Sequence, residues 1–312
     1  MNLTRADRIS AGLWGLLIGD AVGVPYEFYS AEELPSLTRI DMMPPAGFRR
    51  AHPGVPSGTW SDDGAQALCL LASLLHCGAL EPGDLSRRLV NWADVGYMAV
   101  DHRVFDIGIQ TQTALARLRG GTAPLLAGPA GERDNGNGSL MRVLPLALWH
   151  QGSDSELVRD ACAQSRITHG HERAQAVCAF YCLWARELLA GAEDAWNRAA
   201  ARLDACLGEQ PQLIHEVAYI LKPEHADRIA GSGYVLDTLW SARHALDTQP
   251  DCMGVIRAAI ALGNDTDTTA CVAGGLAGIR HGMAAIPSHW LNALRGKDLV
   301  EPLLSDLLSK AS

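Results

Sequence analysis

The stretch GNDTDTTACVAGGLAGIRHG, residues 263–282, decides the fold. Its second part predicts a helix over residues 270–282, with three glycines in the run from Ala273 to Gly278. A glycine inside a helix costs about 1 kcal/mol relative to alanine, unless another backbone packs closely against it. We therefore expect this helix to lie at the centre of the protein.

Most of the remaining chain shows the same helical period. No long alternating run predicts a strand, so we expect roughly a dozen helices joined by short loops. Two stretches rich in Pro and Gly, Tyr29–Trp60 and Gly120–Asn137, break this pattern, and loops of that length are usually functional or disordered. Apolar residues at spacings of three or four include Ile9, Leu13, Leu16, Leu17, Leu68, Leu71, Leu74, Leu75, Val177, Phe180, Tyr181 and Trp184.

Length and composition limit the classes of protein that fit. The 312 residues suit one large core, and no linker or repeat marks a boundary, so we predict one domain over residues 1–312. A formal net charge of -9 argues against a broad grip on nucleic acid or anionic membranes. Eight cysteines without a Cys-x-x-Cys pair favour the reducing cytoplasm. The apolar run Leu13–Gly19 stops at Asp20 and is too short for a membrane span.

A first candidate site lies at residues 58–64, GTWSDDG, directly before the apolar helix predicted over residues 65–76. Ser61, Asp62 and Asp63 would stand at the N-terminus of that helix. Taken alone, they are better explained as caps, because hydroxyl and carboxylate oxygens accept hydrogen bonds from the free amides there.

The fold-deciding stretch contains a second candidate, the alternating oxygen ligands of Asp265, Asp267 and Thr268. Magnesium and manganese prefer such hard ligands, although capping explains this motif equally well. If both helix starts met, four aspartates would converge, and each close pair would repel by about 4 kcal/mol at 4 Å. Such a cluster needs protons or cations, but the sequence does not itself show the convergence.

The turn GDAVGVPYE, residues 19–27, places Asp20 and Glu27 on either side of a Gly/Pro segment. Glu27 could act as a base or orient water. A solvated loop carboxylate is the more economical interpretation of Glu27 alone. Asp20 could simply hold the turn.

A small-residue turn at residues 134–142, DNGNGSLMR, precedes another apolar segment. Glycines there would let the amides of Gly136, Asn137, Gly138 and Ser139 approach a diphosphate at a helix start. An ordinary Asn-Gly turn explains the pattern equally well.

Three further residues are weaker candidates. Asp106 could contact a ribose and Tyr234 could stack on a base, although a cap and a core position explain them too. The segment containing His169, THGHE at residues 168–172, lacks the two-histidine spacing of a zinc helix. We therefore expect the two histidines of this segment, His169 and His171, to have supporting or structural roles.

Taken in order, these motifs resemble the ADP-ribosylglycohydrolase family along nearly the whole chain. The resemblance implies an all-α, single-domain orthogonal helical bundle with a central dinuclear metal site of magnesium or manganese. Glu27 and Asp62 would be catalytic, and the Gly136–Ser139 turn would hold the diphosphate near His169, with Asp106 and Tyr234 as further substrate contacts. The implied metal ligands are Ser61, Asp62, Asp63, Asp265, Asp267 and Thr268.

Two positions depart from the family pattern. Gly64 stands where a second threonine is usual, so one hydroxyl is missing beside Asp63. Asp134 and Asn135 stand where some relatives carry an aromatic residue before the Gly-Asn-Gly turn. Adenine would then stack elsewhere, and Tyr234 is the candidate.

The resemblance implies a hydrolase that releases ADP-ribose from a protein or a small ADP-ribosyl substrate, and we expect this hydrolase to be a monomer. We expect ADP-ribosyl-arginine to be the substrate. The alternatives are another linkage (serine, nucleobase or small molecule), a non-catalytic ADP-ribose reader and a metal phosphohydrolase that cuts the diphosphate.

Overall fold

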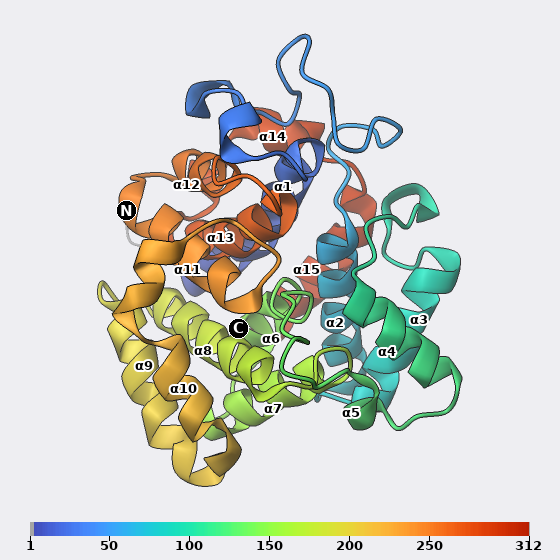
Figure 1. Ribbon diagram of the computed structural model, residues 1–312, viewed down its shortest axis with the longest axis vertical. Helices are drawn as coiled ribbons and strands as arrows, with labels where there is room; N and C mark the ends of the chain where they lie inside the picture. Colours follow the sequence, from blue (N-terminus) through green and yellow to red (C-terminus); the bar gives the residue numbers. More distant parts are fainter. Residues whose placement is uncertain (1–2, 312) are drawn as a thin grey trace.

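The computed structural model describes residues 3–311, and within them it contains α-helices, short 3-10 helices and loops but no β-strand (Figure 1). The predicted all-α class is confirmed, with 15 α-helices instead of about a dozen. The helices are α1 (Arg5–Gly23), α2 (Asp62–Cys77), α3 (Pro82–Val95), α4 (Ile109–Arg119), α5 (Pro124–Ala127), α6 (Leu144–Trp149), α7 (Asp154–Arg166), α8 (Glu172–Leu189), α9 (Ala195–Cys206), α10 (Ile214–Ile220), α11 (Val235–Thr248), α12 (Cys252–Ile260), α13 (Thr266–His281), α14 (Ser288–Ala293) and α15 (Lys297–Ala311). The 3-10 helices are η1 (Val24–Tyr26), η2 (Ala31–Glu33), η3 (Leu37–Arg39), η4 (Val100–His102), η5 (Leu207–Glu209), η6 (Pro211–Leu213), η7 (Pro223–Arg228) and η8 (Met283–Ala285).

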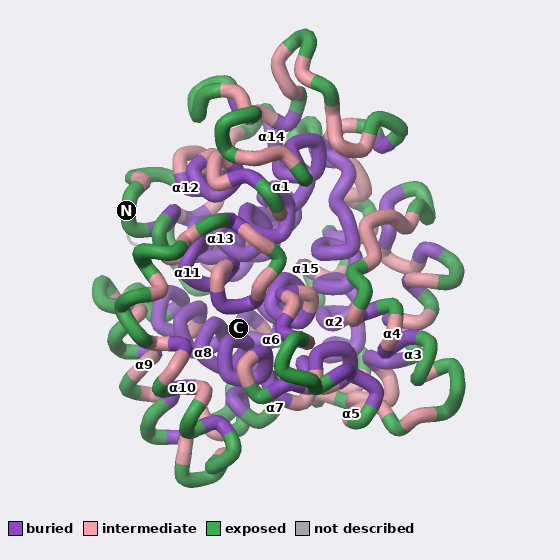
Figure 2. The backbone as a smooth tube through the Cα atoms, in the orientation of Figure 1, coloured by how far each residue is buried: buried purple, intermediate pink, exposed green. Residues whose placement is uncertain are grey.

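Helices α1 and α13 pack against each other along their length at the centre of the protein, as the glycines predict. A Cβ placed on Gly274 would lie 2.4 Å from the carbonyl oxygen of Gly15, and one on Gly278 would lie 1.9 Å from that of Ala11. Both helices are almost wholly buried (Figure 2). The glycines are therefore required for the two backbones to approach this closely.

The two helices run antiparallel, and this direction positions the candidate site. Near the end of α1, a Cβ on Gly23 would lie 2.4 Å from the Cα atom of Asp267 near the start of α13. The chain that leaves α1 is held there by two backbone hydrogen bonds, from Phe28 N to Asn264 O (2.7 Å) and from Asn264 N to Tyr29 O (2.6 Å). Glu27 is thereby brought next to the Asp265–Thr268 motif.

Replacing Gly278 by alanine should therefore destabilise the protein strongly. The added methyl would meet a backbone carbonyl that cannot rotate away, so we expect a loss of about 3 kcal/mol in the free energy of unfolding. Gly208→Ala is the matched control, because a Cβ at Gly208 meets nothing within 4 Å. Urea denaturation of both variants measures the difference, and equal midpoints would contradict the close approach of α1 and α13.

The segment Arg5–Tyr26 has the length and apolar composition of a membrane span, but 94% of its most apolar 18 residues are buried inside the protein. The short run Leu13–Gly19 thus belongs to a longer apolar helix than the sequence suggested. Its composition is explained by its central position in the core, where α1 contacts α13.

Candidate functional site

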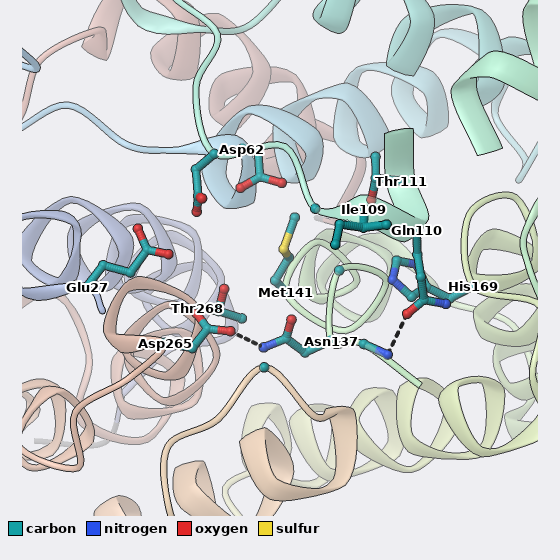
Figure 3. Close-up of a pocket in the computed structure, with 15 residues that line it drawn as sticks. Glu27, Asp62, Ile109, Gln110, Thr111, Asn137, Met141, His169, Asp265 and Thr268 are labelled. Atoms are coloured by element: carbon teal, nitrogen blue, oxygen red, sulfur yellow. Dashed lines mark hydrogen bonds between the residues drawn. The ribbon is translucent and has the colours of Figure 1, made fainter. Parts of the chain in front are cut away.

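A cleft lies where the end of α1, the starts of α2 and α13 and the 136–138 turn come together (Figure 3). Glu27, Asp62 and Asp265 line one end of it, and His169 and Gln110 line the other. Asp106, Gly136, Asn137, Gly138 and Thr268 complete the predicted residues that reach the cleft. Segments more than 200 residues apart in sequence thus contribute to one site, as the two aspartate motifs required.

Asp20 fixes the start of α2 against the end of α1. Its buried carboxylate accepts hydrogen bonds from the amides of Ser61 (2.8 Å) and Gly64 (2.8 Å). Asp20 therefore caps a different helix instead of holding its own turn. Ser61 is the N-cap residue of α2 and its hydroxyl accepts from the amide of Asp63, so the capping interpretation is correct for Ser61.

The start of α13 meets this helix end through direct side-chain contacts. The hydroxyls of Ser61 and Thr268 both donate to Oδ2 of Asp63, at 3.1 and 3.3 Å. Asp265 occupies the N-cap position of α13 without making a side-chain cap, and its Oδ2 instead accepts a hydrogen bond from the side-chain Nδ2 of Asn137 at 2.8 Å. Capping thus fails to explain the carboxylate of Asp265.

Two of the buried carboxylates each keep one oxygen without a hydrogen-bond donor. Oδ1 of Asp63 and Oδ2 of Asp267 have no hydrogen-bond partner among the described residues. Burial, followed by repulsion from neighbouring carboxylates, raises the pKa of Asp62, Asp63 and Asp267 well above the ordinary value. A hard divalent cation would satisfy the free oxygens and offset the repulsion, so the donor set fits such an ion.

Glu27 is buried, so the interpretation of this residue as a solvated loop carboxylate is wrong. Its Oε2 contacts Nε2 of His52 at 2.6 Å, and one ligand atom from each of Glu27, His52 and Asp106 falls within 4.8 Å of the others. Glu27 forms a second group of this kind with Asp265 and Asp267. Burial and the nearby carboxylate of Asp106 raise the pKa of Glu27 to about 11.

Strained backbone gathers at the same place. Six non-glycine residues among those described have positive φ, and three of them are Phe28 (69°), Asp106 (58°) and Asn264 (60°). Phe28 follows Glu27, Asn264 precedes Asp265, and Asp106 itself lines the cleft. Such conformations are costly and persist where the surrounding structure imposes them, frequently at active sites.

Comparison with known proteins agrees with this geometry. A model of the family described as ADP-ribosylglycohydrolase matches residues 1–312. The chain belongs to this family. An ADP-ribosylarginine hydrolase of Pseudomonas putida (strain GB-1) is 32% identical over 307 residues, covering 98% of this chain and 79% of that protein.

Two further relatives support the assignment to the ADP-ribosylglycohydrolase family. An ADP-ribosyl-dinitrogen reductase glycohydrolase of Rhodospirillum rubrum is 30% identical, with 92% of this chain and 90% of that protein covered. A solved structure described as an ADP-ribosylglycohydrolase-related protein complex has 31% identity and a TM-score of 0.76, and 99% of each chain is covered.

The Gly136–Ser139 turn departs from the predicted diphosphate cradle in this family member. The amide of Gly136 donates to Oε1 of Gln110 (2.7 Å) and that of Asn137 to the carbonyl of Gly233 (3.1 Å), so neither is free for a ligand. Within residues 3–311, the amides of Gly138 and Ser139 have no protein acceptor. The next helix, α6, begins only at Leu144, so this turn is not a helix start.

Ser139 and Tyr234 direct their side chains away from the cleft. The buried hydroxyl of Ser139 pairs with that of Ser165 at 2.9 Å. The hydroxyl of Tyr234 accepts from Arg173 at 3.3 Å, in a separate pocket that also includes Trp240. The structure therefore gives no support to adenine stacking on Tyr234, because this residue lines that other pocket and not the cleft.

His169 lines the cleft as predicted, and burial lowers its pKa to about 3, so its ring is neutral at physiological pH. A Cβ on Gly138 would lie 2.8 Å from its Cε1, so this glycine makes room for the imidazole. His171 caps α8 by accepting from the amide of Arg173, which agrees with a structural role for this histidine.

Sequence analysis missed His52, Gln66 and Gln110 altogether. Gln66 had a usable signal, because it lies four residues after Asp62 on one helix face and donates to its Oδ2 at 2.9 Å. His52 and Gln110 reach the site from an irregular segment and from another helix, so no local pattern could have identified them.

Proposed function

We propose that this protein is a metal-dependent hydrolase that releases ADP-ribose from ADP-ribosyl-arginine on a target protein. Membership of the family makes it an ADP-ribosyl glycohydrolase, and the arginine linkage is supported by the Pseudomonas putida relative, an ADP-ribosylarginine hydrolase. The observation that carries the proposal is the group of buried carboxylates, two of whose oxygens lack partners, beside Glu27 at one end of the cleft.

Two magnesium or manganese ions would be held by oxygen atoms from both helix starts. We assign Ser61, Asp62 and Asp63 from α2, and Asp265, Asp267 and Thr268 from α13. When bound, the ions supply positive charge that orients the ribose hydroxyls and lowers the pKa of water. The free oxygens of Asp63 and Asp267 favour this assignment.

The reaction breaks the bond between the anomeric carbon of ribose and the guanidino nitrogen. Water provides the hydroxyl that the carbon gains, and the departing nitrogen takes up a proton. Such a centre reacts through an oxocarbenium-like state, which neighbouring carboxylates stabilise. We assign Glu27 the role of moving that proton or guiding the water, with Asp62 and Asp106 beside it.

The rest of the substrate would extend from Glu27 towards His169. We assign the amides of Gly138 and Ser139, which have no acceptor among the described residues, as the diphosphate donors in place of the four amides first predicted; of the two residues, only Gly138 lines the cleft. Asp106 and Asn137 line the same path, and Asp106 remains our candidate for a ribose contact. The modified arginine would leave from the Glu27 end.

We also propose that the chain is a cytoplasmic monomer with a single domain over residues 1–312, of which residues 1, 2 and 312 lie outside those described. Its cysteines form no disulfide among the described residues, as a reducing compartment requires.

A substrate panel tests the proposed function. Peptides ADP-ribosylated on arginine, serine or glutamate, and an ADP-ribosylated nucleobase, should be incubated with the enzyme and magnesium or manganese. We expect free ADP-ribose from the arginine substrate at least tenfold faster than from the others, about 1.4 kcal/mol of selectivity.

The products separate the alternatives. AMP instead of ADP-ribose would indicate a phosphohydrolase, and tight binding without turnover of any substrate would indicate a reader. Rapid release from another linkage, with none from arginine, would overturn the choice of substrate but not the metal assignment.

A further inference from the structure

Arg142 is the one fully buried lysine or arginine among residues 3–311, and no carboxylate lies within 4.0 Å of its guanidinium in that part of the chain. Burial lowers its pKa to about 10, so the group is charged at neutral pH. A buried ion without an opposite charge is costly, and natural proteins rarely contain one without a function or a compensating network. The family motif drew attention to this residue but gave it no role.

All of the hydrogen bonds of Arg142 go to neutral acceptors on three different segments. The guanidinium donates to the side-chain Oε1 of Gln164 (3.1 Å) and to the backbone carbonyl of Gln164 (2.9 Å), and this residue lies on α7. It also donates to Oε1 of Gln66 on α2 (3.0 Å) and to the carbonyl of Gly138 in the cleft turn (3.3 Å). Arg142 thus ties together a helix that carries predicted metal ligands and the turn that faces the substrate.

The chemistry of these groups fixes the direction of the contact with Gln66. A guanidinium only donates, so the oxygen of the Gln66 amide must face Arg142 and its nitrogen must face away. That nitrogen lies 2.9 Å from Oδ2 of Asp62 and donates to it. Arg142 therefore determines which way Gln66 points, and Gln66 in turn holds one oxygen of Asp62 in place.

We propose that Arg142 is a positioning residue that links the two halves of the site. Through Gln66 it orients the metal-facing carboxylate of Asp62, and through the Gly138 carbonyl it holds the turn that would receive the diphosphate. Its positive charge lies beneath the cleft, where it favours both the carboxylates and an anionic substrate. This inference rests on the proposed function, which identifies the two ligands as a divalent metal ion and ADP-ribose.

The connection from Arg142 through Gln66 to Asp62 predicts different effects for substitutions at Gln66 and at Arg142. Gln66→Leu keeps the volume but removes the bond to Asp62, and partners of this kind typically contribute 10- to 100-fold to metal affinity. We expect its manganese Kd to rise about tenfold, while its ADP-ribose Kd at saturating manganese stays within twofold of wild type. Arg142→Lys keeps the charge but loses the fork that reaches both segments, so both Kd values should rise.

Isothermal calorimetry with manganese alone, and then with ADP-ribose, measures these constants without relying on turnover. Arg117→Lys is the matched control, because Arg117 also donates to a backbone carbonyl, that of Ala127, but lies outside the cleft lining. Thermal unfolding confirms that each variant is folded. If Arg142→Lys fails to fold, Gln66→Leu and Gln66→Met still test the link to Asp62.

A double variant distinguishes a linked pair from two separate effects. Arg142 acts on Asp62 through Gln66, so Gln66→Leu combined with Arg142→Lys should bind manganese no more weakly than the worse single variant. Additive losses, or a manganese Kd for Gln66→Leu within twofold of wild type, would overturn the proposal. Manganese binding by a wild-type protein that releases no ADP-ribose would instead count against the proposed function.

Discussion

Chelation of divalent cations is expected to abolish ADP-ribose release and to lower the melting temperature. Without cations the repulsion among the buried carboxylates of Asp62, Asp63 and Asp267 is relieved only by protons. A ligand at 100 times its Kd stabilises the folded state by about 2.7 kcal/mol, which corresponds to a shift of about 5 °C for a chain of this size. Magnesium or manganese should restore both activity and stability.

The size of this effect should depend on pH. Burial raises the pKa of Asp20 to about 7. Burial and repulsion from the nearby carboxylate of Asp106 raise the pKa of Glu27 to about 11. A carboxyl whose pKa is raised by folding gives full stability below its unfolded pKa, near 4, and that stability is lost as pH rises through the folded value. Metal-free protein should therefore be less stable at pH 8 than at pH 5, and added metal should matter more at pH 8.

Calorimetric unfolding with EDTA and with manganese, at both pH values, provides the measurement. Asp267→Asn should bind metal weakly and show little response to EDTA, whereas Asp298→Asn, at an exposed position in α15, should behave like wild type. Full activity in EDTA-treated protein would contradict the metal model.

The central helix pair could be predicted from sequence because its cause is local. Gly274 and Gly278 are costly in an isolated helix, so a close backbone partner was implied. The identity of that partner was not implied, since the contacts with Gly15 and Ala11 join segments some 260 residues apart. The end of α1 could therefore not be placed beside α13 from periodicity alone.

The residues of the site could likewise be predicted from sequence, but their convergence could not. Ser61 and Asp265 were recognisable as polar groups at helix starts. The oxygen-bearing residues that follow each of them indicated hard ligands for a metal ion. Their convergence depends on Asp20, whose carboxylate bonds to the amides that begin α2. An aspartate near the end of one helix gives no sequence sign that it caps another helix more than 40 residues later.

Predictions about the substrate side were weaker because they depended on the direction of side chains and amides. Gly136 and Asn137 form the expected turn, but Gln110 and Gly233 accept their hydrogen bonds. Tyr234 adjoins the same turn through its backbone while its ring contacts another pocket. A motif specifies which residues are adjacent in the chain, whereas tertiary packing decides which of their atoms face the ligand.

Glu27→Gln is expected to reduce kcat by 10²- to 10⁴-fold, the usual contribution of a group that moves a proton. The change keeps the shape of the side chain and its capacity to contact His52, which lies 2.6 Å away. It removes only the proton exchange of the carboxyl group. ADP-ribose and manganese should therefore bind with Kd values within about threefold of wild type, a difference below 1 kcal/mol.

Metal binding decides between the two roles that the geometry of Glu27 allows. Its carboxylate lies close to two groups of possible ligand atoms. One group comprises His52 and Asp106, and the other comprises Asp265 and Asp267. A metal ligand would lose manganese affinity together with activity, whereas a group that acts on the proton or the water would lose turnover alone. Calorimetry beside steady-state kinetics separates these outcomes, with Glu32→Gln, at an exposed position in the neighbouring segment, as the control for a Glu-to-Gln change outside the cleft. Equal losses of metal affinity and kcat in Glu27→Gln would assign Glu27 to the metal centre, and the proton would then have to pass through Asp106.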